Sequence, residues 1–429
     1  MVKNKISITT AILININVII GSAFYIGAQG ILKKSGILAP VTWIIWGIIL
    51  LPIVLVLAQL SNIYPRAGGL YIYCKEALGN FWGIISGWGY FIGCIAGNAI
   101  IIHFFGLGIR RLGFEPVLKT LYLSNLQFDI ILILFFSLLN LTNINFLEKA
   151  IITFAILKSI PLFFVVISSF FLFDAKNIIT APLNISGFFE SIPLVVFAYM
   201  GFEVCCSIAH QIKNGKKGTG KAILISFGLI MAIYTILQFC LLSIHGVTSS
   251  KPFLEILPRL FSNPYLSIIG NRIIELCILS SFLGGFYGMF YTNNWILYAI
   301  AQEKNIPFSK KLTLLNKYNI PWVCVAIQSF ITILFLFITQ NAHYLITMSV
   351  FAVIITYLLC AIAFLVIYIR KKNLKKIILA TISTLSCIYI FYICIVELIE
   401  SGIKYILPFL IILGIGILLN KISLKHPTK

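Results

Sequence analysis

Charged side chains are scarce in this chain. Only 10% of its 429 residues are charged, whereas 60% are hydrophobic, and the mean hydropathy is +1.04. A soluble globular domain carries about a quarter charged residues. The stretches between the apolar runs are short, so the sequence leaves no room for a separate soluble domain. The composition therefore predicts an all-helical integral membrane protein.

Acidic residues are scarcer still, with 12 Asp and Glu against 32 Lys and Arg, a net charge of +20. Such an excess can indicate nucleic acid binding, but here the basic residues gather in alternate loops. The densest groups are Lys213/Lys216/Lys217/Lys221, Lys304/Lys310/Lys311/Lys317 and Arg370/Lys371/Lys372/Lys375/Lys376. This is the positive-inside bias of multi-pass proteins, which sets orientation. We expect both termini in the cytoplasm and no nucleic acid partner.

Organised cysteine, histidine and carboxylate groups are also absent from the sequence. Most of the ten cysteines lie inside apolar runs, where a thiol behaves as a small hydrophobic group. No Cys/His spacing resembles a zinc site, and no paired carboxylates or His/Asp pairs indicate an enzyme. Asp129 is expected near a membrane interface, and His103 is expected to be structural. We predict a protein that is not an enzyme and that uses no cofactor or metal.

Twelve apolar segments approach the length of about 20 residues that a spanning helix needs. They lie near 9–33, 37–62, 81–107, 127–144, 148–173, 187–211, 221–246, 266–301, 322–340, 343–369, 376–397 and 403–421. An even number of spans returns the C-terminus to the side of the N-terminus, in agreement with the charge pattern.

Two of these segments are broken near their midpoints by small, polar, glycine-bearing patches. The first is Ile20-Gly21-Ser22-Ala23-Phe24, and the second is Phe197-Ala198-Tyr199-Met200-Gly201-Phe202-Glu203. Unwound backbone at membrane depth survives only where it lines a cavity in the protein. Either glycine alone would indicate helix packing. Breaks in the first and sixth spans together are typical of a secondary transporter that holds its substrate at the bilayer midplane.

Matched breaks in spans one and six suggest two five-helix repeats of opposite topology, over residues 1–173 and 187–369, with accessory helices over 376–421. Between spans two and three stands Pro65-Arg66-Ala67-Gly68-Gly69-Leu70-Tyr71-Ile72-Tyr73. It resembles the Pro-x-x-Gly-Gly-x-Tyr-x-Tyr signature of the amino acid–polyamine–organocation superfamily. The patches at Gly21-Ser22-Ala23-Phe24 and Tyr199-Met200-Gly201-Phe202-Glu203 resemble two further motifs of that family. The resemblance implies the leucine-transporter-like fold and transport of amino acids or polyamines, here across a bacterial inner membrane.

The resemblance also implies substrate-binding residues. Tyr90 and Asn98 look like the span-three cavity residues of bacterial basic amino acid/amine exchangers. Ser22 and Phe197 match substrate contacts of those exchangers, and Ser349 falls near their contact in span ten. Met289 takes the place of an aromatic gate, and Ala23 stands where a glycine is usual. The breaks add Gly21, Ala198, Tyr199 and Gly201 to the set of expected substrate-binding residues.

Two ionisable residues inside spans are candidates for coupling or gating, namely Lys158 and Glu203. An unpaired charge there is costly, so each must pair, be neutral or face water. Lys158 resembles the span-five lysine of proton-coupled family members. Because desolvation disfavours the charged amine, it could lose and regain a proton during transport.

Two modes of transport stay open, since Lys158 favours proton-coupled uptake and Tyr90/Asn98 favour exchange of an amino acid for an amine. A channel or a membrane enzyme fits the breaks less well. The expected partners are an amino acid or amine substrate, protons and the lipid bilayer. A homodimer is left open.

Overall fold

The chain is a bundle of long helices, seen in a computed structural model that describes residues 5–120, 122–249, 252–401 and 407–425. In these ranges nine helical stretches are long and apolar enough to cross a membrane. They are Ile8–Tyr25, Ala39–Ile63, Asn80–Phe114, Ile144–Leu172, Ile185–Gln211, Gly215–His245, Pro264–Gln302, Tyr344–Arg370 and Leu374–Val396. Three shorter apolar helices accompany them, at Asn125–Asn140, Trp322–Ile338 and Leu410–Ser423. The prediction of an all-helical membrane protein is confirmed.

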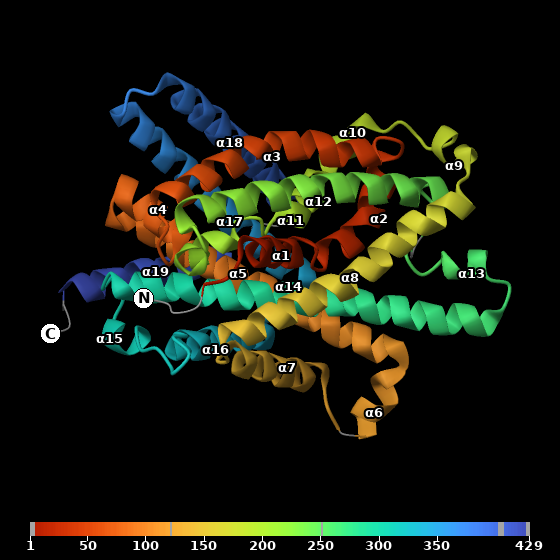
Figure 1. Cartoon of the computed structure of the whole chain (residues 1–429), viewed down its shortest axis with the longest axis horizontal. Coiled ribbons are helices and arrows are strands. Elements are labelled where there is room, and N and C mark those ends of the chain that lie inside the picture. The colour runs from red at the N-terminus through yellow and green to blue at the C-terminus, as the bar shows by residue number, and fades with distance from the viewer. Residues whose placement is uncertain (1–4, 121, 250–251, 402–406, 426–429) are drawn as a thin grey trace.

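The long helices run roughly parallel to the longest axis of the molecule (Figure 1). The uninterrupted ones are α3 (Ala39–Ile63), α5 (Asn80–Ile109), α7 (Asn125–Asn140), α8 (Ile144–Leu172), α12 (Gly215–His245), α14 (Pro264–Gln302), α16 (Trp322–Ile338), α17 (Ala342–Arg370), α18 (Leu374–Ser401) and α19 (Leu407–Lys425). Short connecting helices lie toward the two ends of the bundle. They are α4 (Gly69–Leu78), α6 (Glu115–Thr120), α9 (Ala175–Ile179), α10 (Ile185–Glu190), α13 (Leu257–Leu260) and α15 (Ser309–Leu312), and the π-helix η1 (Arg110–Phe114) extends α5.

Several helices begin where the sequence offers a side-chain cap. Ser124 and Gln127 form a reciprocal capping box at the start of α7, and Asn143 accepts from the Phe146 amide at the start of α8. Such caps satisfy amides that have no partner inside the helix. The polar turn before α8 therefore separates α7 from α8 with few connecting residues, whereas η1 and α6 lie between α5 and α7.

The Gly68-Gly69 pair of the loop motif lets the start of α4 pack tightly. Gly68 has φ +86°, and a methyl group there would lie 2.2 Å from Ala299 Cβ. A methyl group at Gly69 would lie 2.5 Å from the carbonyl carbon of Cys206. The motif therefore fits α4 between α14 and the second half of the broken sixth segment.

Both broken segments sit inside the bundle. The first comprises α1 (Ile8–Ile19) and α2 (Ala23–Ser35), and the second comprises α11 (Ile192–Tyr199) and the 3-10 helix η2 (Val204–Gln211). α1 packs against α12, α14 and α8, and α2 packs against α10 and α11. α3, α5 and α17 surround this pair through their contacts with α12, α14 and one another.

Backbone pairing joins the two broken segments at both of their ends. Ile6, just before α1, pairs in parallel with Ile212, just after η2, through hydrogen bonds of 2.9 Å on each side. Gly36, just after α2, pairs with Leu183, just before α10. Chain segments about 150 to 200 residues apart are thus held together at the two ends of the bundle.

Candidate functional site

The first break exposes the beginning of a new helix inside the bundle. α1 ends at Ile19, Ile20 has the non-helical angles φ −82° and ψ 58°, and α2 begins at Ala23. No side chain caps α2. Among the described residues, the amides of Gly21, Ser22 and Ala23 donate no hydrogen bond. Free amides at a helix start carry partial positive charge and suit an anionic group.

The second break lies at Gly201, which has φ +112°. α11 ends at Tyr199, and the chain resumes as the 3-10 helix η2, where the sequence led us to expect an α-helical half. Positive φ favours glycine, because a Cβ would crowd the backbone. The break predicted at this residue is present, and its second half is more tightly wound than expected.

The two breaks touch each other. A methyl group at Gly201 would lie 2.6 Å from Val18 Cγ1 and 3.1 Å from the Ile19 nitrogen. The Tyr234 hydroxyl of α12 lies 2.9 Å from the Ile19 carbonyl oxygen and 3.2 Å from that of Ala198, so it links the two interrupted helices. A methyl group at Gly21 would lie 3.1 Å from the Val18 oxygen and 4.0 Å from Gly285 Cα of α14, so this position is tight mainly against its own segment. Gly201 is therefore required both by its backbone angle and by this close approach.

Lys158 projects from α8 onto the first break. It is 2% exposed, and its Nζ donates to the Asn17 oxygen at 2.9 Å and to the Ile20 oxygen at 2.7 Å. Ser281 of α14 donates to the same Ile20 oxygen at 2.5 Å. In the part of the chain that the structure describes, Lys158 has no carboxylate partner. The ammonium is held by carbonyl groups that the break has freed.

Glu203 lies at the second break, where two hydrogen bonds of good geometry reach its carboxylate from the described residues. The Tyr90 hydroxyl of α5 donates to Oε1 at 2.7 Å, and the Gly201 amide donates to Oε2 at 3.0 Å. The carboxylate thus closes the turn at Gly201 and ties it to α5. The Tyr90 hydroxyl is engaged by Glu203 here, although the sequence led us to expect it at the substrate.

Two predicted substrate contacts, Met289 of α14 and Ser349 of α17, meet beside Gly97 of α5. A methyl group at Gly97 would lie 3.0 Å from Ser349 Oγ and 3.8 Å from Met289 Sδ. The next residue, Asn98, is fully buried, and neither its Nδ2 nor its Oδ1 has a hydrogen-bond partner among the described residues. A buried amide with unmet donors and acceptor is costly unless a ligand or water completes it.

The other predicted contacts lie along the breaks. Ser22 and Ala23 are buried at the start of α2, whereas Phe197 is half-buried. Ala198 and Tyr199 are fully buried. The Tyr199 hydroxyl donates to the Trp43 oxygen at 2.8 Å, and its ring packs among aromatic side chains of α3 and α12. Tyr199 therefore supports the break from the side of α3.

Asp129, which the sequence led us to expect near a membrane interface, lies near the start of α7 but faces the protein interior. Asp129 is fully buried, and its Oδ2 is 2.8 Å from His103 Nδ1, which joins α7 to α5. The two residues are far apart in sequence, but both lie in apolar segments near the same end of neighbouring spans. That shared depth was the only signal in the sequence, and it does not reveal which helices touch.

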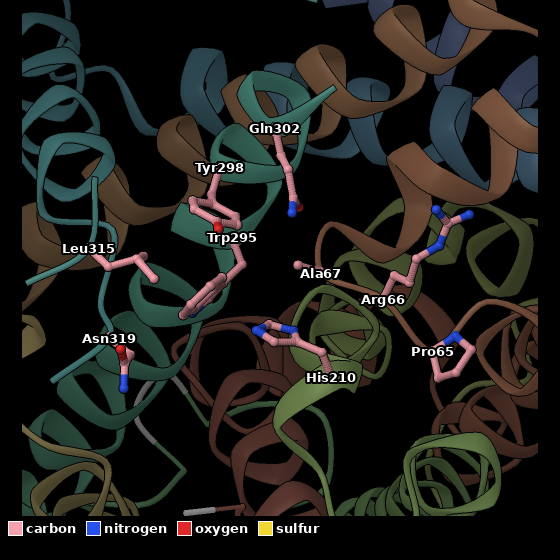
Figure 2. Close-up of a pocket in the computed structure, with 9 residues that line it drawn as sticks. All are labelled: Pro65, Arg66, Ala67, His210, Trp295, Tyr298, Gln302, Leu315 and Asn319. Carbon is pink, nitrogen blue, oxygen red and sulfur yellow. The ribbon is translucent and has the colours of Figure 1, made fainter. Parts of the chain in front are cut away.

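A hollow with a mixed polar and apolar lining lies at the end of α14 and η2 (Figure 2). It has a volume of about 330 Å³ and is lined by Pro65, Arg66, Ala67, His210, Trp295, Tyr298, Gln302, Leu315 and Asn319. The rings of His210 and Trp295 lie edge to face, 4.5 Å apart between centroids, and the Tyr291 hydroxyl donates to Gln211 at 2.8 Å. These two contacts hold η2 against α14 beside the hollow, and we call this the seam between η2 and α14.

The cysteines form no disulfide, and one of them, Cys205 of η2, donates from its Sγ to the Ala11 oxygen of α1 at 3.1 Å. All ten cysteines are free and buried. Within the described ranges, no group of three or more His, Cys, Asp or Glu side chains is arranged to hold a metal ion. Beside Lys158 and Glu203, the site offers backbone amides, carbonyls and neutral polar side chains, which can bind a solute.

Comparison with known proteins gives matches over nearly the whole chain. A family model described as amino acid permease matches residues 6–418. The chain is similar to the serine/threonine exchanger SteT of Bacillus subtilis (strain 168), with 27% identity over 87% of this chain and 84% of that protein. It is also similar to the aspartate-proton symporter of that organism, with 26% identity over 87% of this chain and 75% of the relative. A third relative from that organism, the gamma-aminobutyric acid permease, shows 22% identity over 87% of this chain and 80% of the relative.

Proposed function

Since the chain belongs to the amino acid permease family and is an amino acid transporter rather than an enzyme, we propose that it works by alternating access around the two helix breaks. The observation that carries this proposal is the contact between Gly201 and Val18, which puts both interruptions at one point in the bundle. Free amides and carbonyls meet there at membrane depth, as binding at a bilayer midplane requires.

The proposed architecture is two inverted five-helix repeats, residues 1–173 and 187–369, followed by accessory helices at 376–421. The positions of the breaks in the first and sixth apolar segments support it. The three shorter apolar helices would bring the number of spans to twelve. With the basic loops inside, both termini would lie in the cytoplasm of a bacterium.

An amino acid fits the breaks by charge. Its carboxylate would accept hydrogen bonds from the free amides of Gly21, Ser22 and Ala23 at the start of α2. Its ammonium would meet carbonyl oxygens of the unwound segments. Asn98, with its unmatched amide, and Ser349 would face the side chain of the substrate.

The charges near the site favour a neutral substrate side chain. Lys158 is occupied by two carbonyl groups, and Glu203 is occupied by Tyr90 and the Gly201 amide. Neither is left to pair with a charged side chain, and burying an unpaired charge is expensive. A neutral, small or medium amino acid is therefore the preferred substrate, ahead of arginine, agmatine or another polyamine.

Proton coupling through Lys158 is the proposed energy source. The protonated amine makes charge-assisted hydrogen bonds to the freed carbonyls and so holds α1 against α8. Loss of the proton weakens those bonds and lets the break change shape. In this proposal Lys158 binds and releases one proton in each transport cycle, as the first broken helix changes shape.

Exchange of one amino acid for another is the second candidate, favoured by the likeness to a serine/threonine exchanger. Proteoliposomes separate the two modes. Uptake of radiolabelled L-serine driven by an inward proton gradient, without internal amino acid, supports symport. Uptake that requires internal L-serine and ignores the gradient supports exchange. Failure of every neutral amino acid in both assays would contradict the proposed substrate class.

A further inference from the structure

Four lysines surround the turn between η2 and α12. Lys213, Lys216, Lys217 and Lys221 are all exposed. Three of them line a hollow of about 460 Å³, together with Asn214, Gly215, Gly218 and Ile8, the first residue of α1. The hollow therefore lies between the start of the first broken segment and the start of α12.

No opposite charge balances this cluster among the residues that the structure describes. The ion pairs found there are Arg66–Glu76, Lys75–Glu303, His103–Asp129 and Arg110–Glu115, none of which includes the four lysines. Positive-inside orientation explains why basic residues lie at this end. It does not explain why they surround a hollow beside α1.

The lysines sit where a lipid-facing surface begins. Lys217, Lys221 and Ile225 follow each other at intervals of four residues and share one face of α12. Leu224 and Ile225 are 39% and 45% exposed, and Leu229 is 47% exposed. The charged hollow thus lies one helical turn beyond exposed apolar side chains of a membrane-spanning helix.

We propose that this hollow binds the phosphate of an anionic phospholipid whose acyl chain lies along Leu224, Ile225 and Leu229 of α12. Each lysine near a membrane surface favours an anionic lipid about fivefold. The adjoining apolar face favours a phospholipid over a free anion. Because Ile8 lines the hollow and Ile6 pairs with Ile212, the bound lipid braces the start of α1 against α12.

The test measures the thermal unfolding of the purified full-length protein in detergent. Phosphatidylglycerol, phosphatidylcholine with the same chains, and inorganic phosphate are titrated separately. The test variant is Lys216→Gln/Lys217→Gln/Lys221→Gln. A matched control, Lys311→Gln/Lys317→Gln/Lys375→Gln, removes the same charge from exposed lysines outside the hollow.

Phosphatidylglycerol should raise the unfolding temperature of the wild-type and control proteins. In the test variant, the phosphatidylglycerol concentration that gives half of the maximal rise in unfolding temperature should increase by roughly tenfold or more. The single change Lys217→Gln should increase it about fivefold. Phosphatidylcholine and phosphate should have little effect on any of them. The single variant keeps the test valid if the triple variant folds poorly.

Three results would overturn the proposal. One is equal stabilisation by phosphatidylcholine and phosphatidylglycerol. Another is an undiminished phosphatidylglycerol effect in both the triple variant and Lys217→Gln. The third is the same stabilisation by inorganic phosphate alone, which would indicate an anion site without a lipid.

Discussion

Two buried polar residues near the centre of the bundle have opposite surroundings. Lys158 satisfies its ammonium with main-chain oxygens of Asn17 and Ile20, which no longer bond along a helix. Asn98 has no hydrogen-bond partner among the described residues. A satisfied charge stabilises the break itself, whereas an unsatisfied amide awaits a ligand. We therefore propose that Lys158 shapes the site and that Asn98 contacts the solute.

Replacing Lys158 with alanine should abolish proton-driven accumulation and leave substrate binding measurable. The variant leaves the Asn17 oxygen without this donor, at a cost of about 1–3 kcal/mol, while Ser281 still serves Ile20. Uptake against an amino acid gradient in proteoliposomes is the measurement. Lys149→Ala is the control, because Lys149 is an exposed lysine on the same helix. Proton-driven accumulation by Lys158→Ala would refute the coupling role.

Replacing Gly201 with alanine should destabilise the protein and weaken substrate binding. Positive φ alone costs an L-residue about 1–2 kcal/mol, and the new methyl group would meet Val18 at 2.6 Å. The control is Gly228→Ala in α12, where a methyl group meets nothing within 4 Å and should stabilise the helix by up to about 1 kcal/mol. Thermal unfolding with and without ligand distinguishes them. Equal behaviour of the two variants would show that the break at Gly201 does not matter.

At the scale of elements, the two broken segments form one unit. Backbone pairs join them at Ile6/Ile212 and at Gly36/Leu183, and Tyr234 bridges them in the middle. Motion that separates α1 from η2 must break the first pair. The seam between η2 and α14 is closed separately by Tyr291 and Gln211. A path from the breaks to the hollow of Figure 2 can therefore open only if the Ile6/Ile212 pair or the Tyr291–Gln211 hydrogen bond breaks.

A disulfide between Ile6→Cys and Ile212→Cys should stop transport reversibly. Ile6 and Ile212 form an isolated β-bridge, and residues paired in this way are close enough for a disulfide. Oxidation of the double variant should block uptake, and a reductant should restore it. Each single variant serves as a control for the ten native cysteines, which are free and buried. Full uptake by the cross-linked protein would mean that this pair stays closed throughout the cycle.

The sequence predicted elements better than their contacts. Glycine beside polar residues in an apolar run identified both breaks, because few other uses of that pattern are stable in a membrane. The 3-10 winding of η2 and the pairing of Asp129 with His103 were missed. Both depend on which helices meet, and Asp129 gives no local sign of its partner on α5. Tyr90 illustrates the same limit, since its contact with Glu203 joins residues 113 positions apart.

At the scale of the whole molecule, charge is kept away from the centre. The net charge of +20 lies largely on exposed lysines, while Lys158 and Glu203 are each held by partners inside the bundle. The site therefore offers a substrate no unpaired side-chain charge, and its free polar groups are mainly the backbone amides and carbonyls of the breaks. Selection among amino acids would then depend on the size and hydrogen bonding of the side chain, through Asn98, Met289 and Ser349.

Neutral amino acids should stabilise the purified protein, and charged ones should not. Ligand that binds the folded state alone at 100 times its dissociation constant adds about 2.7 kcal/mol of stability. L-serine, L-threonine and L-alanine are compared with L-arginine, agmatine and L-aspartate in a thermal-shift assay. Asn98→Ala should reduce the shift given by L-serine more than that given by L-alanine. A larger shift with arginine or agmatine would return the assignment to an amine exchanger.

The most direct measurement is an experimental structure of the protein with saturating L-serine. We predict density for one amino acid between the two breaks, with its carboxylate within hydrogen-bond distance of the Ser22 and Ala23 amides and its hydroxyl near Asn98. Empty breaks, with serine bound only in the hollow beside His210 and Trp295, would contradict the central claim that the unwound backbone holds the substrate.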